Sequence, residues 1–251
     1  MLDTLARHRI ERVRHDTRRR TLTVDTVTRL TPHMLRIGFT GDLADFVSLS
    51  ADDHVKLFFP VAGEADAMRD YTPRRFDTER GTMTIDFALH DAGVATAWAM
   101  VATPGDTLAI GGPRGSAIIP ADFDWYWLIG DETALPAIGR WLEEASVLVP
   151  VTTFVVVESF ADIQAVRSDA AWTPVWVPRD GVSDDAALLQ AAMAKHDMPP
   201  GDGFVWIAAE ASVARAVRGY VLDERRHPRE WIKAGGYWVR GKADAHDRMD
   251  D

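Results

Sequence analysis

The chain has no cysteine among its 251 residues. This absence excludes disulfides, thiolate metal sites, iron–sulfur clusters and cysteine nucleophiles. The eight histidines show no metal-ligand spacing, so we expect no metal site built by the protein. No apolar run approaches the roughly 18 residues of a membrane-spanning helix, so stable membrane insertion is not expected.

Positive charge is also scarce, because 28 Lys and Arg residues face 38 Asp and Glu residues and leave a net charge of −10. Such a balance disfavours nucleic-acid binding, and any anionic ligand must be met by a local basic cluster. Residues 1–20 are polar and rich in arginine, without the apolar segment of a secretory signal, so we expect a cytoplasmic protein.

The first half of the chain reads as an antiparallel β-barrel. Short segments alternate polar and apolar residues, which is typical of half-buried strands, and turn signals such as Thr31-Pro32 separate them. These predicted strands span 21–27, 34–39, 53–59 and 81–90.

The segment Arg69-Asp70-Tyr71-Thr72-Pro73-Arg74 contains two guanidiniums, an aromatic ring and a hydroxyl within six residues. If it forms one strand, Arg69, Tyr71 and Pro73 face one side, and the other three face the opposite side. It then offers an aromatic ring for stacking, a hydroxyl for a heteroatom and guanidiniums for phosphate oxygens. The alternative is an edge strand that carries a solvated Arg/Asp pair.

Two glycine-containing segments follow. A turn at 91–93 precedes an alanine-rich helix over 94–100, whose first turns offer free backbone N–H groups to a phosphate. A strand over 107–110 leads into Gly111-Gly112-Pro113-Arg114-Gly115. That cluster fits no known phosphate-loop pattern, so it is either a phosphate loop of another kind or a plain tight turn.

The second half reads as a doubly wound parallel sheet. Continuous apolar runs at 124–130, 152–158, 174–177 and 204–209 are typical of buried strands, and helical segments at 134–145, 185–195 and 212–224 alternate with them. Ligands of such sheets bind at the carboxyl ends of strands. Those ends carry Gly130-Asp131-Glu132, Glu158-Ser159 and Ala209-Glu210.

The order of these blocks resembles the siderophore-interacting protein family, a group of bacterial FAD-dependent ferric-siderophore reductases within the ferredoxin-reductase superfamily. The resemblance implies an FAD-binding barrel over residues 1–121 and an NAD(P)H-binding α/β domain with a C-terminal tail over 122–251. It rests on Asp53-His54-Val55-Lys56-Leu57, Arg69 to Arg74, Asp86-Phe87-Ala88-Leu89-His90, Trp98-Ala99, Gly112-Pro113-Arg114-Gly115, Gly130 to Ile138 and Gly236-Tyr237-Trp238-Val239-Arg240-Gly241.

For the FAD site, the resemblance implies that Tyr71 stacks on the flavin ring and that Thr72 approaches its reactive nitrogen, as the catalytic pair. Arg69 and Arg74 would hold phosphates, and Pro73 would stiffen the strand end. His90 is either a cofactor contact or a structural residue. The further cofactor-binding residues implied are Asp86, Phe87, Leu89, Gly93, Thr96, Ala97 and Trp98.

For the nucleotide site, the resemblance implies contacts from Asp131, Glu132, Thr133 and Glu210 to NADPH or NADH. The sequence departs from the wider superfamily here, because Asp131-Glu132-Thr133 replaces a glycine-rich turn and Ala209 stands in a glycine position. Arg179 is either a partner for a nucleotide 2′-phosphate or a solvated charge, and Arg167 has the same two interpretations.

The implied activity moves electrons from NAD(P)H through FAD to siderophore-bound Fe(III), which releases Fe(II). Lys56, Arg114 and Arg240 are the predicted substrate-binding cations; the alternative is three separate surface charges. Trp238 and Tyr237 either cover the flavin or anchor the tail.

A ferredoxin is an alternative electron donor. The competing functions are a general NAD(P)H:flavin electron-transfer reductase and a non-enzymatic siderophore-binding protein.

Overall fold

The computed structural model describes residues 8–61, 63–90, 93–241 and 247–248, so the first two residues of the turn expected at 91–93 lie outside the described residues. The chain divides into two compact units. Ile10–Ile119 form one, here called the barrel unit. Pro120 onward, joined by His8 and Arg9, form the other, here called the α/β unit. The functional division at residues 121 and 122 remains a prediction.

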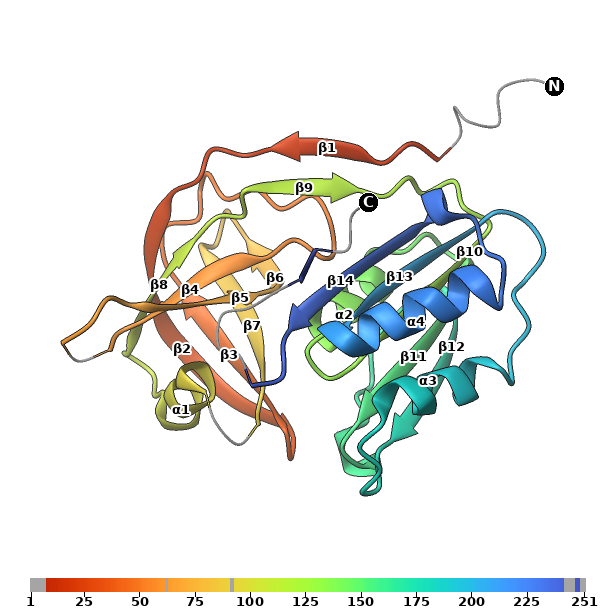
Figure 1. Cartoon of the computed structure of the whole chain (residues 1–251). Helices are drawn as coiled ribbons and strands as arrows, with labels where there is room; N and C mark the ends of the chain where they lie inside the picture. The colour runs from red at the N-terminus through yellow and green to blue at the C-terminus, as the bar shows by residue number, and fades with distance from the viewer. Residues whose placement is uncertain (1–7, 62, 91–92, 242–246, 249–251) are drawn as a thin grey trace. The chain divides into compact units, whose positions relative to one another are not determined.

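The barrel unit contains a seven-stranded antiparallel sheet and a two-stranded ribbon (Figure 1). The sheet runs in the order β5-β4-β8-β2-β3-β7-β6 and is curled, which confirms the predicted antiparallel barrel architecture. The elements are β1 (Glu11–Arg14), β2 (Arg19–Thr31), β3 (Met34–Thr40), β4 (Val55–Phe59), β5 (Ala67–Tyr71), β6 (Pro73–Asp77), β7 (Thr82–Ala88), α1 (Val94–Val101), β8 (Thr107–Gly111) and β9 (Gly115–Ile118).

The segment from Arg69 to Arg74 does not form one strand, because it is interrupted at Thr72. β5 ends at Tyr71 and β6 begins at Pro73, and these consecutive strands lie at opposite ends of the sheet order. Pro73 has no N–H for a strand ladder and disfavours many conformations of Thr72, which explains the break. The chain therefore passes from one edge of the curled sheet to the other across one residue.

The core of the barrel unit is aromatic around α1. The Trp98 ring lies 5.8 Å from the Phe59 ring, 6.0 Å from the Phe87 ring and 6.3 Å from the Phe39 ring, measured between centroids. All three phenylalanines are buried. Since such rings bury large apolar areas, they fix α1 against the sheet (Figure 1).

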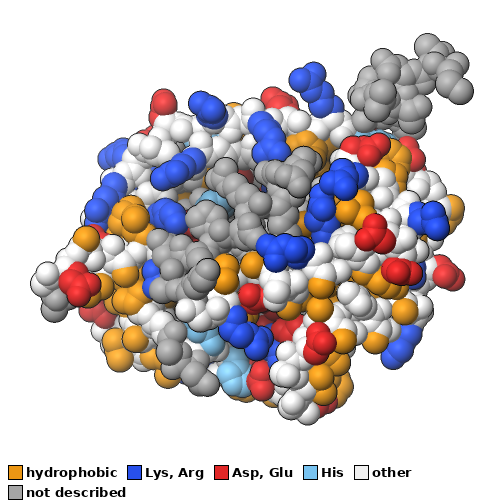
Figure 2. Space-filling view, viewed as in Figure 1, with side chains coloured by type: hydrophobic (Ala, Val, Ile, Leu, Met, Phe, Trp, Pro, Cys, Tyr) orange, Lys and Arg blue, Asp and Glu red, His pale blue; other side chains and the backbone are white. Residues whose placement is uncertain are grey.

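The ribbon of β1 and β9 was not predicted from the sequence. β1 pairs antiparallel with β9, with Arg12 opposite Ala117 and Arg14 opposite Gly115. Both arginines are exposed, and Figure 2 shows Lys and Arg side chains gathered where this ribbon runs. A short, charged ribbon of this kind is a common way to keep exposed strand edges from pairing with other chains.

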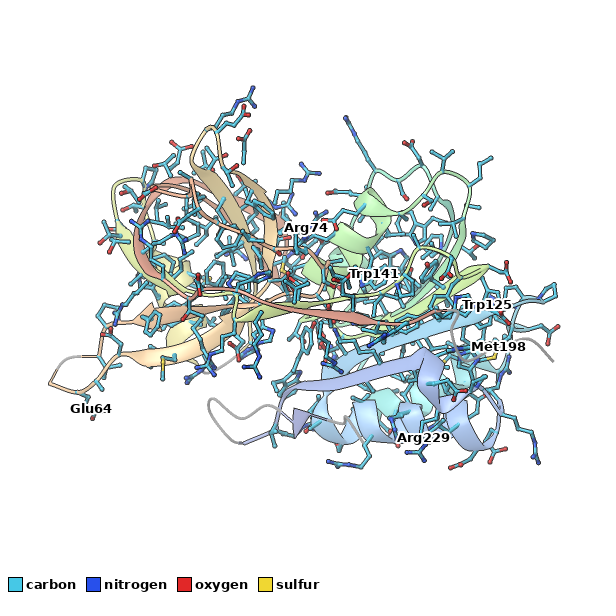
Figure 3. All side chains as sticks on the ribbon, turned by 90° about the horizontal axis from the view of Figure 1, so that it is seen from above. Glu64, Arg74, Trp125, Trp141, Met198 and Arg229 are labelled. Carbon is cyan, nitrogen blue, oxygen red and sulfur yellow. The ribbon has the colours of Figure 1, made fainter. Side chains whose placement is uncertain are left out.

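The α/β unit holds a six-stranded sheet in the order β12-β11-β10-β13-β14-β15, parallel except for β15. Helices α3 and α4 cover one face and α2 the other (Figures 1 and 3), which confirms the predicted doubly wound fold. The elements are β10 (Trp125–Gly130), α2 (Leu135–Glu144), β11 (Pro150–Val157), β12 (Ala171–Pro178), α3 (Asp185–Met193), β13 (Gly203–Glu210), α4 (Ala211–Asp223), β14 (Ile232–Trp238) and β15 (Asp247–Arg248).

The tryptophans of the central strands are buried, as expected for core residues. Trp125, Trp127 and Trp206 are each at most 2% exposed. Trp176 is only half-buried, because its strand, β12, lies at the edge of the sheet. Among the described residues, no helix is long and apolar enough to span a membrane, and no group of three His, Asp or Glu side chains is arranged to hold a metal ion.

His8 fastens the start of the described chain to the α/β unit. Its ring stacks on Phe123 at 4.1 Å, and its nitrogens lie 2.7 Å from Asp122 Oδ1 and 3.1 Å from Asp202 Oδ2. Burial lowers the pKa of His8, but the hydrogen bonds and charges of Asp122 and Asp202 outweigh burial and raise that pKa above 6.5. The folded state therefore favours the imidazolium form.

This geometry predicts a pH-dependent contribution of His8 to stability. The contribution is complete below pH 6.5, the unfolded pKa, and is lost as the pH rises through the higher folded pKa. We expect His8→Gln to lower the free energy of unfolding by about 1.5 kcal/mol at pH 6 and by less at pH 9. Urea unfolding followed by tryptophan fluorescence measures both values. The double variant Asp122→Asn, Asp202→Asn should show the same loss of pH dependence; a pH-independent effect of His8→Gln would contradict the assignment.

Candidate functional site

Arg69 and Asp70 lie on β5, which pairs with β4. Lys56 stands directly opposite Asp70, and its Nζ lies 2.9 Å from Asp70 Oδ2. Arg69 is half-buried, and its Nη1 donates a 2.7 Å hydrogen bond to the Met68 carbonyl. The Asp70 carboxylate therefore binds Lys56, one of the predicted substrate cations.

Tyr71 and Thr72 stand at the junction of β5 and β6. The Tyr71 ring is half-buried, with its centroid 4.6 Å from that of Phe87. Burial raises the pKa of the Tyr71 phenol, and the nearby charge of Arg69 opposes this only in part, so the phenol is neutral at physiological pH. Thr72 is buried. A neutral ring and a hydroxyl are thus presented together at the sheet junction.

Arg74 is a buried cation, 4% exposed, and is labelled in Figure 3. The pairing of β6 with β7 shifts register between Pro73 and Arg75, which makes Arg74 the extra residue of a β-bulge. Bulges turn side chains out of the regular alternation, and here the consecutive residues Pro73 and Arg74 are both buried. The Nε of Arg74 lies 3.9 Å from Asp86 Oδ2.

Asp86, on β7, is also bound by Arg36, which the sequence did not identify. Arg36 Nε lies 2.6 Å from Asp86 Oδ1, and its Nη2 lies 2.7 Å from Oδ2, a bidentate pair. Arg36 was the one cation in the apolar strand predicted over 34–39, and a cation at such a position is the signal that could have found it.

The start of α1 brings together several predicted cofactor residues. Gly93 caps the helix, and a side chain there would contact the His90 ring at 3.5 Å. The Thr96 hydroxyl is buried without a hydrogen-bond partner in the part of the chain that the structure describes. His90 and Ala97 are exposed, Leu89, Thr96 and Trp98 are half-buried, and Phe87 is fully buried.

These features fit an FAD molecule. A buried guanidinium suits a phosphate, a half-buried neutral ring suits stacking, and the buried Thr96 hydroxyl lacks a partner that a bound ligand would supply. Arg69, Tyr71, Thr72 and Arg74 would hold the cofactor together with the start of α1.

In the α/β unit, Asp131 follows β10 and is 1% exposed. Its Oδ1 accepts hydrogen bonds from the backbone N and the hydroxyl of Thr133, at 2.9 and 2.5 Å. Its Oδ2 accepts from the Glu210 backbone N and from Trp238 Nε1, both at 2.9 Å. Burial and the neighbouring Glu132 raise the pKa of Asp131 to about 6. Trp238 thereby anchors the tail, one of its two predicted roles.

Glu132 and Glu210 are likewise bound to groups of the α/β unit. Glu132 forms a bidentate ion pair with Arg179, which also binds Asp185 through Nε at 2.9 Å and Nη2 at 2.8 Å. Glu210 caps α4: its Oε2 accepts from the backbone N of Ser212 at 2.7 Å and of Val213 at 3.2 Å. The Arg179 guanidinium is therefore committed to carboxylates rather than solvated.

The three predicted substrate cations divide between the units. Lys56 and Arg114 belong to the barrel unit, and Arg240 belongs to the α/β unit. Arg114 and Arg240 are exposed, whereas Lys56 is half-buried against Asp70. The Arg240 backbone N donates to Glu210 Oε1 at 3.2 Å, which joins the tail to the cap of α4.

Asp131→Asn is predicted to destabilise the protein by about 1 to 3 kcal/mol. The amide NH₂ would face donor groups whose hydrogen bonds the carboxylate now accepts, and it cannot accept them. Folding raises the pKa of Asp131 from 3.8 to about 6, so the folded state binds its proton more tightly than the unfolded state. The advantage of the unsubstituted protein over the variant should therefore shrink as the pH rises from about 4 to about 6.

Urea unfolding of both proteins across this pH range measures the effect. Thr133→Val, which removes only one of the four hydrogen bonds, is the matched control and should cost about 0.5 to 1.5 kcal/mol. Equal stability of Asp131→Asn and the unsubstituted protein would contradict the assigned hydrogen bonds.

Comparison with known proteins matches both halves of the chain to family models. Residues 123–241 match "Siderophore-interacting protein", and residues 23–68 and 64–117 match "Siderophore-interacting FAD-binding domain". The NADPH-dependent ferric-chelate reductase of Escherichia coli (strain K12) is 35% identical over 250 residues, covering 91% of this chain and 96% of that protein. Ferric vibriobactin reductase ViuB of Vibrio cholerae is 29% identical, covering 84% and 85%.

Among solved structures, a siderophore utilization protein from T. fusca superposes with a TM-score of 0.86 at 33% identity, over 97% of this chain and 100% of that one. These findings confirm the predicted fold and the predicted protein class, an FAD-dependent oxidoreductase. The chain belongs to the siderophore-interacting protein family.

Proposed function

We propose that this protein is a ferric-siderophore reductase that uses NADPH and FAD to reduce siderophore-bound Fe(III) and release Fe(II). The observation that carries the proposal is the buried Arg74 beside the half-buried Tyr71, on either side of Thr72, within the family's FAD-binding domain. Reductases named for ferric chelates and ferric vibriobactin among the relatives support the acceptor.

In this proposal the barrel unit holds FAD. Bound FAD supplies the chemistry of taking up two electrons as a hydride and giving them up singly. Arg69 and Arg74 bind phosphates, and Tyr71 and Thr72 face the ring. The start of α1, from Gly93 to Trp98, and the preceding residues Leu89 and His90 complete the binding surface, while the fully buried Phe87 supports it from behind through its contacts with the Tyr71 and Trp98 rings.

NADPH is the proposed donor, supported by the name of the Escherichia coli relative. The residues proposed to form its site are Asp131, Glu132, Thr133 and Glu210, at the carboxyl ends of β10 and β13. Since their carboxylates bind internal partners, their role is to shape this edge of the sheet. A ferredoxin donor and a cytoplasmic location stay predictions.

The ferric siderophore is the proposed substrate of Lys56, Arg114 and Arg240. Ferric siderophores are often anionic, and a protein with a net charge of −10 needs local cations to bind them. Reduction loosens a chelate of hard oxygen ligands, because Fe(II) is a softer ion than Fe(III). No ligand from the protein is then required for release.

The experiment that tests the function is anaerobic reduction of the FAD-loaded protein. NADPH is added first, and loss of the flavin absorption near 450 nm reports reduction. A ferric siderophore is then added with a ferrous chelator, and two Fe(II) should appear for each NADPH oxidised. Reoxidation by free flavin or a cytochrome but not by ferric siderophore would favour the general reductase, and a colourless protein that binds no FAD would contradict the proposal.

The triple variant Lys56→Gln, Arg114→Gln, Arg240→Gln should raise KM for an anionic ferric siderophore severalfold and leave FAD content intact, because only the three proposed substrate cations are removed. The control triple variant Arg80→Gln, Lys195→Gln, Arg229→Gln also removes three positive charges, but from other exposed positions. Steady-state kinetics at fixed ionic strength compare the two. An unchanged KM, or an equal rise in both variants, would contradict the assignment.

A further inference from the structure

Asp86 lies between two arginines of neighbouring strands and is 3% exposed. Arg36 occupies both of its oxygens, at 2.6 and 2.7 Å, while Arg74 approaches Oδ2 at 3.9 Å. The Asp86 carboxylate thus forms its bidentate pair with Arg36. The Nε of Arg74 lies at ion-pair distance from the same carboxylate, and this attraction helps to orient the Arg74 guanidinium.

The backbone builds this arrangement from three adjacent strands. Arg36 on β3 stands directly opposite Asp86 on β7, and β7 pairs on its other side with β6, which carries Arg74. The bulge between Pro73 and Arg75 turns Arg74 inward toward Asp86. A buried arginine without a fixed carboxylate nearby would lose much of its orientation, since its long side chain has many rotamers.

We propose that Asp86 and Arg36 are positioning residues: Arg36 holds the Asp86 carboxylate, and Asp86 holds the Arg74 guanidinium in the orientation that binds the phosphates of FAD. Asp86 itself makes no contact with the cofactor, because a carboxylate whose oxygens are both bound to Arg36 has nothing to offer a phosphate except repulsion. This inference rests on the FAD binding proposed above and revises the role predicted for Asp86.

The test measures cofactor affinity of the apoprotein by flavin fluorescence, with FAD and with riboflavin, which carries the same ring without phosphates. Asp86→Asn keeps the shape of the side chain and removes its charge. It should weaken FAD binding roughly tenfold and change riboflavin binding less than twofold. Arg36→Lys keeps the cation, loses the bidentate contact, and should show the same FAD-specific loss.

A double-mutant cycle assigns the effect to Arg74. In an Arg74→Met background, Asp86→Asn should weaken FAD binding little further, because the group that it positions is gone. Asp77→Asn removes the carboxylate of β6, which accepts hydrogen bonds from the backbone N–H groups of Glu79 and Arg80; it is the matched control and should leave FAD affinity unchanged. Urea unfolding of each apoprotein separates loss of affinity from loss of fold.

Equal weakening of FAD and riboflavin, or additive effects of Asp86→Asn and Arg74→Met, would indicate general structural damage and overturn the inference. Unchanged FAD affinity in Asp86→Asn and Arg36→Lys would overturn it as well. If Asp86→Asn does not fold, Arg36→Lys decides. Failure of the unsubstituted protein to bind FAD would overturn the proposed function and this inference together.

Discussion

The passage of the chain across Thr72 is the constraint on which the barrel unit depends. One residue separates β5 from β6, yet these strands lie at opposite ends of the sheet order. A single residue spans less than about 4 Å, so the two edges of the sheet must come together there and the sheet must curl. Tyr71 ends one edge strand, and Arg74 is the bulge residue of the other. Closure of the sheet therefore brings these two residues of the candidate site to the same junction.

The buried charges of the two units follow one electrostatic rule. A buried ion needs partners of opposite charge or several hydrogen bonds, since burial without them is very costly. In the barrel unit, the Arg36 and Arg74 cations lie beside Asp86. In the α/β unit, Asp131 is held by four hydrogen bonds and Glu132 by Arg179. Asp86 thereby connects β7 with β3 and β6, and Asp131 connects the end of β10 with β13 and β14.

Periodicity was sufficient to predict the main strands and helices, because alternation and apolar runs are local properties. It was insufficient wherever the partner is distant in sequence. Strand β1 pairs with residues about a hundred positions away, and Trp238 meets Asp131 across 107 positions. The family resemblance identified Arg74 and Asp86 but not Arg36; its place as the one cation of an apolar strand marks Arg36 as unusual, but its partner Asp86 lies 50 positions away and cannot be identified from local pattern. Alternation left open whether the strand continues past Pro73, because the two halves of this segment pair with strands that are distant in sequence.

The acidic turn after β10 illustrates how side chains replace a glycine-rich loop. In dinucleotide-binding folds, free backbone N–H groups at a helix start bind the phosphates. Here Asp131 Oδ1 accepts from the Thr133 N–H, the Asp131 and Glu132 carbonyls accept from the Ala134 and Leu135 N–H groups, and Pro136 has none. Glu210 occupies the N–H groups of Ser212 and Val213 in the same way. The N–H groups of Thr133, Ala134, Leu135, Ser212 and Val213 are therefore already bound within the protein and are not available to a phosphate at this edge.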